Sequence, residues 1–238
     1  MKKAQISMFI LLGIVLLMIS ALIFYATNLM QNKVEIKPVE ASSAKDLVEY
    51  CLGSVADDAL LTIGKQGGFA NLGIDYFEPL KTSYLYDRGE NKALDSTAVE
   101  QQLSDYIDAN IAKCIGNFDL LRERKIEVIE KSQPKVTTIL AEKDVQFLIS
   151  YDIEEKKGDI TTMPEFLPAI KTVKLKEMTD LANSMAEAEK NNGLFDLDAN
   201  CELEITHFPV EKTLVTVITD KDFLIQDKPY RFVFAHRR

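Results

Sequence analysis

The sequence predicts an α+β protein, with an N-terminal transmembrane helix followed by an extracytoplasmic domain of about three helices and an antiparallel sheet. A long uncharged apolar run lies close to the N-terminus, behind Lys2 and Lys3. Beyond that run, the apolar residues follow helical spacing twice, then alternate as in strands, then return once to each pattern. Because helices and strands come in separate groups along the chain, an antiparallel sheet is favoured over a parallel one.

Residues 6–30 form the predicted transmembrane helix, behind a basic leader at residues 1–5. No charged residue lies between Lys3 and Lys33, and about 20 apolar residues suffice for a helix to cross the hydrocarbon core. Lys2 and Lys3 keep the N-terminus cytoplasmic under the positive-inside rule. We therefore expect a single-pass protein of the cell membrane, in contact with membrane lipid, with its C-terminal domain outside.

A cleaved secretory signal is the first alternative for this segment. Such signals have an apolar region of roughly 7–15 residues and small residues at the cleavage site. Here the run is longer, and no small-x-small site stands near its end. An uncleaved signal-anchor is therefore favoured over a cleaved signal.

The residues directly ahead of the apolar run suggest a third interpretation. Lys3, Ala4 and Gln5 resemble the processing site of archaeal type IV prepilins and archaellins. The resemblance implies that a prepilin-type peptidase cuts between Ala4 and Gln5, and that the helix is kept for assembly with like subunits.

The match to this family covers only part of its pattern. Gln5 and Ser7 agree with it, whereas Phe9 stands where the family has Glu, and Gly13 stands where it has Leu. In the family that Glu is thought to pair with the new N-terminus of a neighbouring subunit. The resemblance thus implies leader processing more strongly than filament formation.

The wider arrangement carries a second resemblance. The leader, the anchor and a cysteine-bearing helix that ends in Gln66-Gly67-Gly68 are similar to uncharacterised membrane-anchored proteins of archaea. This resemblance implies no activity.

Net charge limits the partners of the extracytoplasmic part. The whole chain carries −9, and the only charges before Lys33 are two lysines, so the remainder carries −11. Nucleic acids and anionic lipid headgroups need a basic surface, so we expect neither as a partner. His236-Arg237-Arg238 is a small basic exception, which we expect to be a frayed end.

Cys51 and Cys114 form the predicted disulfide among three cysteines, the third being Cys201. Each of the two lies on the apolar stripe of a predicted helix, so the sulfurs meet if the stripes face each other. The bond would close a loop of about 63 residues and contribute roughly 4 kcal/mol in the loop-entropy model. The alternative is that all three are buried free thiols.

The extracytoplasmic α+β domain is predicted over residues 44–238, behind a stalk at residues 31–43. Its first helix starts at a Ser42 or Ser43 cap and ends at Gly64 and the Gly67-Gly68 pair. The second runs from Asp95 or Ser96 to Ile115, and the third spans 167–191 and is stopped by Asn192-Gly193. The predicted strands are 126–128, 135–141, 145–153, 159–163, 201–205, 214–218 and 230–234. A charged tip at 154–158 and turns at 207–209 and 220–222 separate them.

Residues 69–90 are rich in aromatic side chains and look irregular. We favour a cover over the core. The alternative is a contact loop for a partner, made by Tyr76, Phe77, Tyr84 and Tyr86. The preceding residues 64–69 lack the GxxxxGK[ST] order of a phosphate-binding loop, so a structural turn is favoured there.

The sequence shows no catalytic signature. The only histidines are His207 and His236, and His207 is expected in a surface turn. The cysteines are too far apart for a C-x₂₋₄-C zinc site. The paired carboxylates are expected to be solvated charge, at Asp57-Asp58, Glu154-Glu155 and Asp220-x-Asp222. We therefore predict no catalytic residue, no cofactor and no metal.

These observations favour a structural, adhesive or assembly role over an enzyme, with a pilin-like subunit as the most concrete version. The alternative function is a membrane-tethered binding module or an accessory subunit of a cell-envelope complex.

Overall fold

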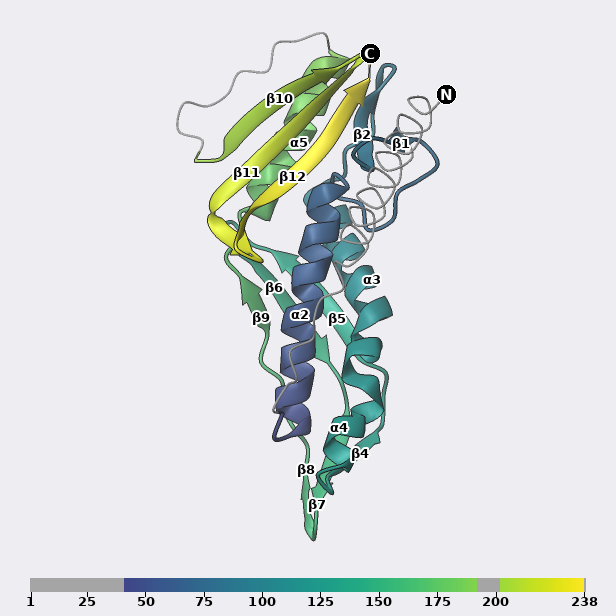
Figure 1. Ribbon diagram of the computed structural model, residues 1–238, viewed down its shortest axis with the longest axis vertical. Coiled ribbons are helices and arrows are strands. Elements are labelled where there is room, and N and C mark those ends of the chain that lie inside the picture. Colours follow the sequence, from purple (N-terminus) through teal and green to yellow (C-terminus); the bar gives the residue numbers. More distant parts are fainter. Residues whose placement is uncertain (1–40, 192–201, 238) are drawn as a thin grey trace, which may run out of the picture. The chain divides into compact units, whose positions relative to one another are not determined.

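The computed structural model describes residues 41–191 and 202–237 (Figure 1). All of them belong to a unit that begins at Ala41, separate from a unit of residues 1–40. The predicted leader and transmembrane helix, and residues 31–40 of the predicted stalk, therefore lie outside the described residues. Within residues 41–191 and 202–237, no helix is long and apolar enough to cross a membrane. The α+β class of the domain is confirmed, with three long helices and mostly antiparallel strands.

The first two long helices begin where the sequence predicts. Helix α2 (Ala44–Lys65) is capped by Ser43, whose hydroxyl accepts a hydrogen bond from the Asp46 amide at 3.2 Å. Helix α3 (Ser96–Ile115) is capped by Asp95 in the same way. Gly67 and Gly68 follow α2 with positive φ angles, which glycine adopts at little cost.

The third long helix is shorter than predicted. Helix α5 spans Leu175–Lys190, whereas the sequence predicts a start at residue 167. The difference arises because Ala169–Lys171 pairs with another strand as β9, so the chain is still extended there. Two short helical turns follow α3, namely η1 (Gly116–Phe118) and α4 (Asp119–Arg122). Asn192 and Gly193 lie outside the described residues.

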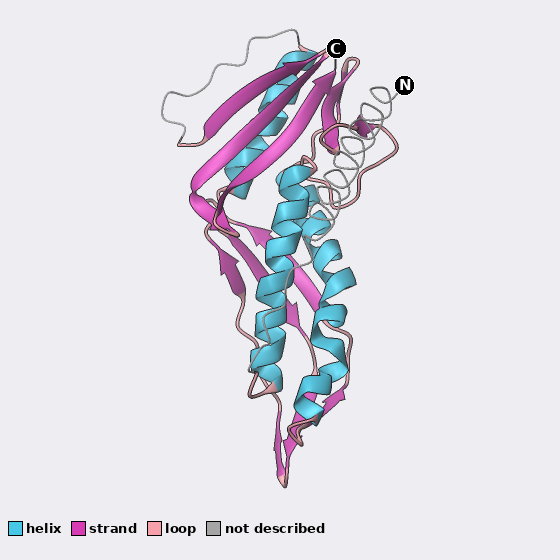
Figure 2. Cartoon of the chain, viewed as in Figure 1, coloured by secondary structure: helices cyan, strands magenta, loops and turns pink. Residues whose placement is uncertain are grey.

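The largest sheet has six strands and combines distant parts of the chain. Strands are drawn in magenta in Figure 2. Its order is β1-β2-β12-β11-β10, with β3 paired to β2. Strand β12 runs parallel to β2, and all the other pairings are antiparallel. The strands are β1 (Tyr76–Phe77), β2 (Thr82–Asp87), β3 (Glu90–Asn91), β10 (Glu204–Val210), β11 (Thr213–Ile225) and β12 (Lys228–Arg237).

Strand β12 fills the core with alternate aromatic residues. Tyr230, Phe232 and Phe234 are all buried, and the Tyr230 hydroxyl donates a hydrogen bond to the carbonyl of Leu60 in α2 at 3.0 Å. A separate buried cluster includes Ala235 of β12 with the residues Phe77, Tyr84 and Val215. The strand therefore contributes to two packed clusters.

The middle of the chain forms two further sheets of three strands, where the sequence suggests one continuous meander. One has the order β4-β7-β8 and the other β5-β6-β9. The chain passes from one of these sheets to the other at Tyr151 and Asp152, between β6 and β7. The predicted strand at 145–153 is thus divided, and the charged segment before Gly158 is strand β7 instead of a tip. The strands are β4 (Glu127–Glu130), β5 (Lys135–Leu140), β6 (Val145–Ser150), β7 (Ile153–Lys157) and β8 (Ile160–Thr162).

Helix α3 covers the free edge of β5. Glu100, Ser104 and Asp108 lie one helical turn apart and accept hydrogen bonds from the backbone amides of Leu140, Thr138 and Val136, at 2.8, 3.0 and 2.7 Å. An uncovered strand edge invites pairing with another chain. These three side chains occupy the edge instead.

Two predicted turns near the C-terminus are wrong. Residues 207–209 lie inside β10, and the chain reverses just after them at Glu211, which has a positive φ angle. Residues 220–222 form an irregularity inside β11, where the register shifts between Asp220 and Leu224. The turn into β12 lies at Gln226 and Asp227 instead.

Candidate functional site

Cys51 and Cys114 are joined by a disulfide, as the sequence predicts. Their Cα atoms lie 5.6 Å apart, and Cys51 is buried in the face of α2 that packs against α3. Cys201 lies outside the described residues. Disulfides form and persist in oxidising compartments.

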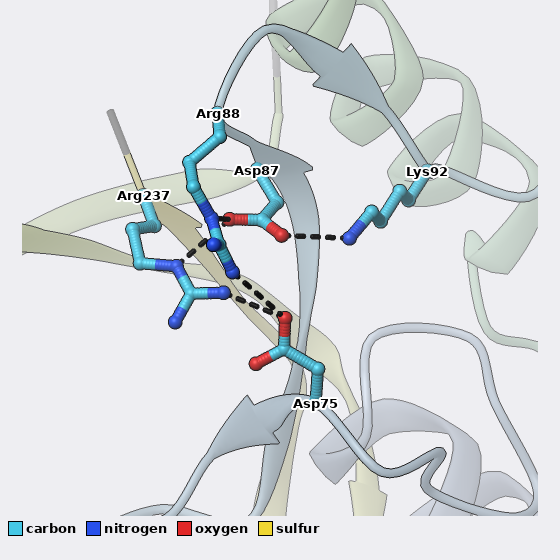
Figure 3. A network of polar contacts seen from close by, with 5 residues as sticks. All are labelled: Asp75, Asp87, Arg88, Lys92 and Arg237. Carbon is cyan, nitrogen blue, oxygen red and sulfur yellow. Dashed lines mark hydrogen bonds and ion pairs between the residues drawn. The ribbon is translucent and has the colours of Figure 1, made fainter.

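The most connected polar cluster lies where β2 and β12 end side by side (Figure 3). The Asp87 carboxylate, 5% exposed, accepts hydrogen bonds from three cations. The donors are Arg237 Nε at 2.8 Å, Lys92 Nζ at 2.7 Å and Arg88 Nε at 3.1 Å. The Asp75 carboxylate accepts from Arg237 at 2.6 Å and from Arg88 at 3.5 Å. We call these five residues the Asp87 cluster.

The parallel pairing of β2 and β12 creates the Asp87 cluster. Asp87 and Arg237 are partners in the register of the two strands, and the Arg88 amide donates to the Arg237 carbonyl at 2.9 Å. Arg88 and Gly89 have positive φ angles and turn the chain into β3. The Arg237 guanidinium also lies 4.3 Å from the ring centre of Tyr84, a cation–π contact.

The charges of the cluster stabilise one another. The hydrogen bond from Arg237, above all, lowers the pKa of Asp87 far below its usual range, with Lys92 and Arg88 adding to the effect. The same bond raises the pKa of Arg237. Both groups therefore stay ionised at any ordinary pH, and neither is suited to transfer protons near neutrality. The arrangement acts as a clamp between strands.

The clamp also presents positive charge to solvent. Three cations face two carboxylates, which leaves one positive charge in excess, and the Arg88 side chain is 67% exposed. A guanidinium in this position can bind a carboxylate or phosphate of a partner.

The C-terminal segment is not a frayed end, contrary to the sequence-based expectation. His236 is buried and Arg237 is the last residue of β12; Arg238 lies outside the described residues. The Asp87 cluster was not predicted from the sequence. The sequence offers no local signal for it, because Asp87 and Arg237 lie 150 residues apart.

The four residues of the alternative contact loop lie in β1 and β2 instead of an irregular loop. Phe77, Tyr84 and Tyr86 are each only 8% exposed, so their rings are part of the core and cannot form a contact surface. Tyr76 alone is half-buried. The contact-loop interpretation is therefore corrected for three of the four residues.

Several of the carboxylates that were predicted to be solvated form hydrogen bonds or ion pairs within the domain. Asp220 is buried, contrary to expectation, and accepts hydrogen bonds from the backbone amides of Lys174 and Asp222 at 3.1 and 3.0 Å. Asp57 pairs with Lys171 at 2.7 Å.

Glu154 and Glu155 also form polar contacts within the domain. Glu154 forms an ion pair with Lys131, and Glu155 accepts from the amide of Ala44 at 2.6 Å.

His207 lies on β10 with its Nδ1 3.0 Å from the Thr216 hydroxyl. Within the described ranges, no group of three or more His, Cys, Asp or Glu residues is placed to hold a metal ion. Lys3, Ala4 and Gln5 lie outside those ranges.

Comparisons with protein-family models, with curated proteins and with solved structures find no match to this chain.

Proposed function

We propose that this chain is a single-pass, membrane-anchored protein whose extracytoplasmic domain has a structural, adhesive or assembly role. The observation that carries the proposal is an uncharged apolar run from Ala4 to Asn32 ahead of a domain closed by the Cys51–Cys114 disulfide. The run supports an anchor. The disulfide supports placement of the domain in an oxidising compartment.

A pilin-like subunit is the most concrete version of this role. Its support is the Lys3-Ala4-Gln5 sequence ahead of the apolar run. Phe9 stands where the family has the Glu that is linked to assembly of subunits. Processing by a prepilin-type peptidase is therefore tested before filament formation.

The test is intact-mass and N-terminal peptide analysis of the protein recovered from its native membrane. A mature chain that begins at Gln5 would support the pilin-like version, and filaments should then be sought by electron microscopy. A chain that keeps Lys2 and Lys3 would contradict that version and leave an uncleaved signal-anchor. Release of the chain from membranes by alkaline carbonate would contradict the anchor itself.

A membrane-tethered binding module is the second candidate. Two exposed side chains favour it: Arg88 of the Asp87 cluster is largely exposed, and Ile74, which precedes Asp75 of the cluster, stands fully in solvent at 104% relative exposure. Ile74→Asp should abolish binding to a protein partner without changing the unfolding midpoint. Arg88→Glu should also abolish binding, but it should lower the midpoint as well, because it removes a hydrogen bond to buried Asp87. Unchanged binding in both variants would contradict a contact surface here.

A further inference from the structure

The chain enters the domain at a point fixed by two hydrogen bonds. The Ala41 carbonyl accepts from Arg124 at 2.8 Å, and the Ala44 amide donates to Glu155 of β7 at 2.6 Å. Glu155 is paired with Thr162 of β8. The start of α2, the segment after α4 and the β7–β8 hairpin therefore lie together at one end of the domain (Figure 1).

Large apolar side chains are exposed at this same end. Ile160, Met163 and Leu167 are 67%, 64% and 63% exposed, and Leu120 of α4 is 47% exposed. Ile160 belongs to β8, and the amide of Leu167 donates to Glu49 in α2 at 2.7 Å. We call these four residues the apolar rim. Several large apolar side chains exposed at one end of a domain indicate an interaction surface.

We propose that the apolar rim rests on the surface of the membrane, with Ile160 and Met163 in contact with lipid at the headgroup–acyl boundary. This inference rests on the proposed membrane anchor. Only residues 31–40 separate the predicted anchor from Ala41, and ten residues extend at most about 35 Å. The elements that carry the rim lie at the same end of the domain as Ala41, so a bilayer that holds the anchor lies within reach of the rim.

The charges of β7 and of the turn between β7 and β8 define the kind of lipid contact. Lys156 and Lys157 are followed, after Gly158, by Asp159, and Glu154 and Glu155 stand just before them. This balance gives no basic footprint for anionic headgroups. The contact is therefore apolar and should form on zwitterionic lipid.

The chain offers a clean probe because it contains no tryptophan. Three full-length variants are needed: Ile160→Trp, Met163→Trp and the control Ile74→Trp. Ile74 is also fully exposed, but its neighbour Asp75 is hydrogen-bonded to Arg237 at the end of β12, at the opposite end of the domain from β7 and β8 (Figure 1). The control corrects for the affinity of tryptophan itself for interfaces.

Each variant is reconstituted in phosphatidylcholine vesicles and then in vesicles of brominated phosphatidylcholine. Side chains at the headgroup–acyl boundary contact lipid directly, so bromine should lower the fluorescence of Ile160→Trp and Met163→Trp by about twofold. Ile74→Trp should be unaffected by bromine and fully quenched by acrylamide from the water. Retention of the Cys51–Cys114 disulfide and an unchanged unfolding midpoint verify that each variant is folded.

Three results would overturn the inference. Equal absence of bromine quenching at positions 160 and 74 would place the rim in water. Shielding of position 160 from acrylamide without bromine quenching would mean that protein covers it. Release of the chain by alkaline carbonate would remove the proposed anchor and this inference with it, whereas the first two results leave the anchor standing.

Discussion

Removal of the disulfide gives the most quantitative prediction for this domain. Cys51→Ala and Cys114→Ala together open a loop of 63 residues. The chain-entropy model assigns about 4 kcal/mol to closure of a loop of this length at 25 °C. Alanine is preferred to serine because Cys51 is only 1% exposed, and a buried hydroxyl without a partner would add its own cost.

The assay is urea unfolding of the wild type and the double variant, each with and without a thiol reductant. Reductant should lower the free energy of unfolding of the wild type by about 4 kcal/mol and leave the double variant unchanged. Cys201→Ala serves as the control and should behave as the wild type. A loss below about 1 kcal/mol in the double variant would refute the loop-closure argument. A wild type in which peptide mapping pairs Cys201 with either cysteine would refute the disulfide itself.

Two further pairs of variants test the packing of the domain by urea unfolding. Asp87→Asn should cost about 3 kcal/mol, because three cations lose their buried partner, whereas Asp119→Asn, at a carboxylate 71% exposed, should change little. The folded-state pKa of Asp87 lies below the unfolded value of about 3.9, so its contribution is complete above about pH 4 and is lost as the pH falls further. The variant should lack this part of the acid destabilisation, and identical acid profiles would contradict the clamp. Gly64→Ala should cost about 2 kcal/mol, since its Cβ would lie 2.4 Å from the Arg231 carbonyl. Gly53→Ala in the same helix meets nothing within 4 Å and should stabilise by up to about 1 kcal/mol; equal effects of the two would rule out the close approach.

The predictions that succeeded depend on short stretches of sequence. Ser43 and Asp95 cap the helices they precede because the capping bond reaches only three residues ahead. The disulfide could also be predicted from the sequence, since helical spacing places Cys51 and Cys114 on apolar stripes that two packed helices bring together.

The predictions that failed depend on pairings between distant segments. Arg237 looked like part of a loose end because nothing near it in sequence reveals Asp87, which lies 150 residues away. Likewise, the covering of the β5 edge by Glu100, Ser104 and Asp108 leaves no local trace, since polar residues one turn apart are ordinary on a helix surface. Asp220 was expected in solvent for the same reason, as one of its two partner amides belongs to the distant residue Lys174.

The position of β12 in the sheet also determines when the domain can finish folding. It lies between β2 and β11, yet it is synthesised after every other described element. Until it emerges, β2 has no parallel neighbour, and α2 lacks Tyr230, whose hydroxyl reaches a carbonyl 170 residues earlier. Contacts across such separations form slowly because long loops must close first. Helices α2 and α3, by contrast, are synthesised early and close together in sequence. A chain crossing a membrane during synthesis could therefore join Cys51 to Cys114 well before its largest sheet is complete.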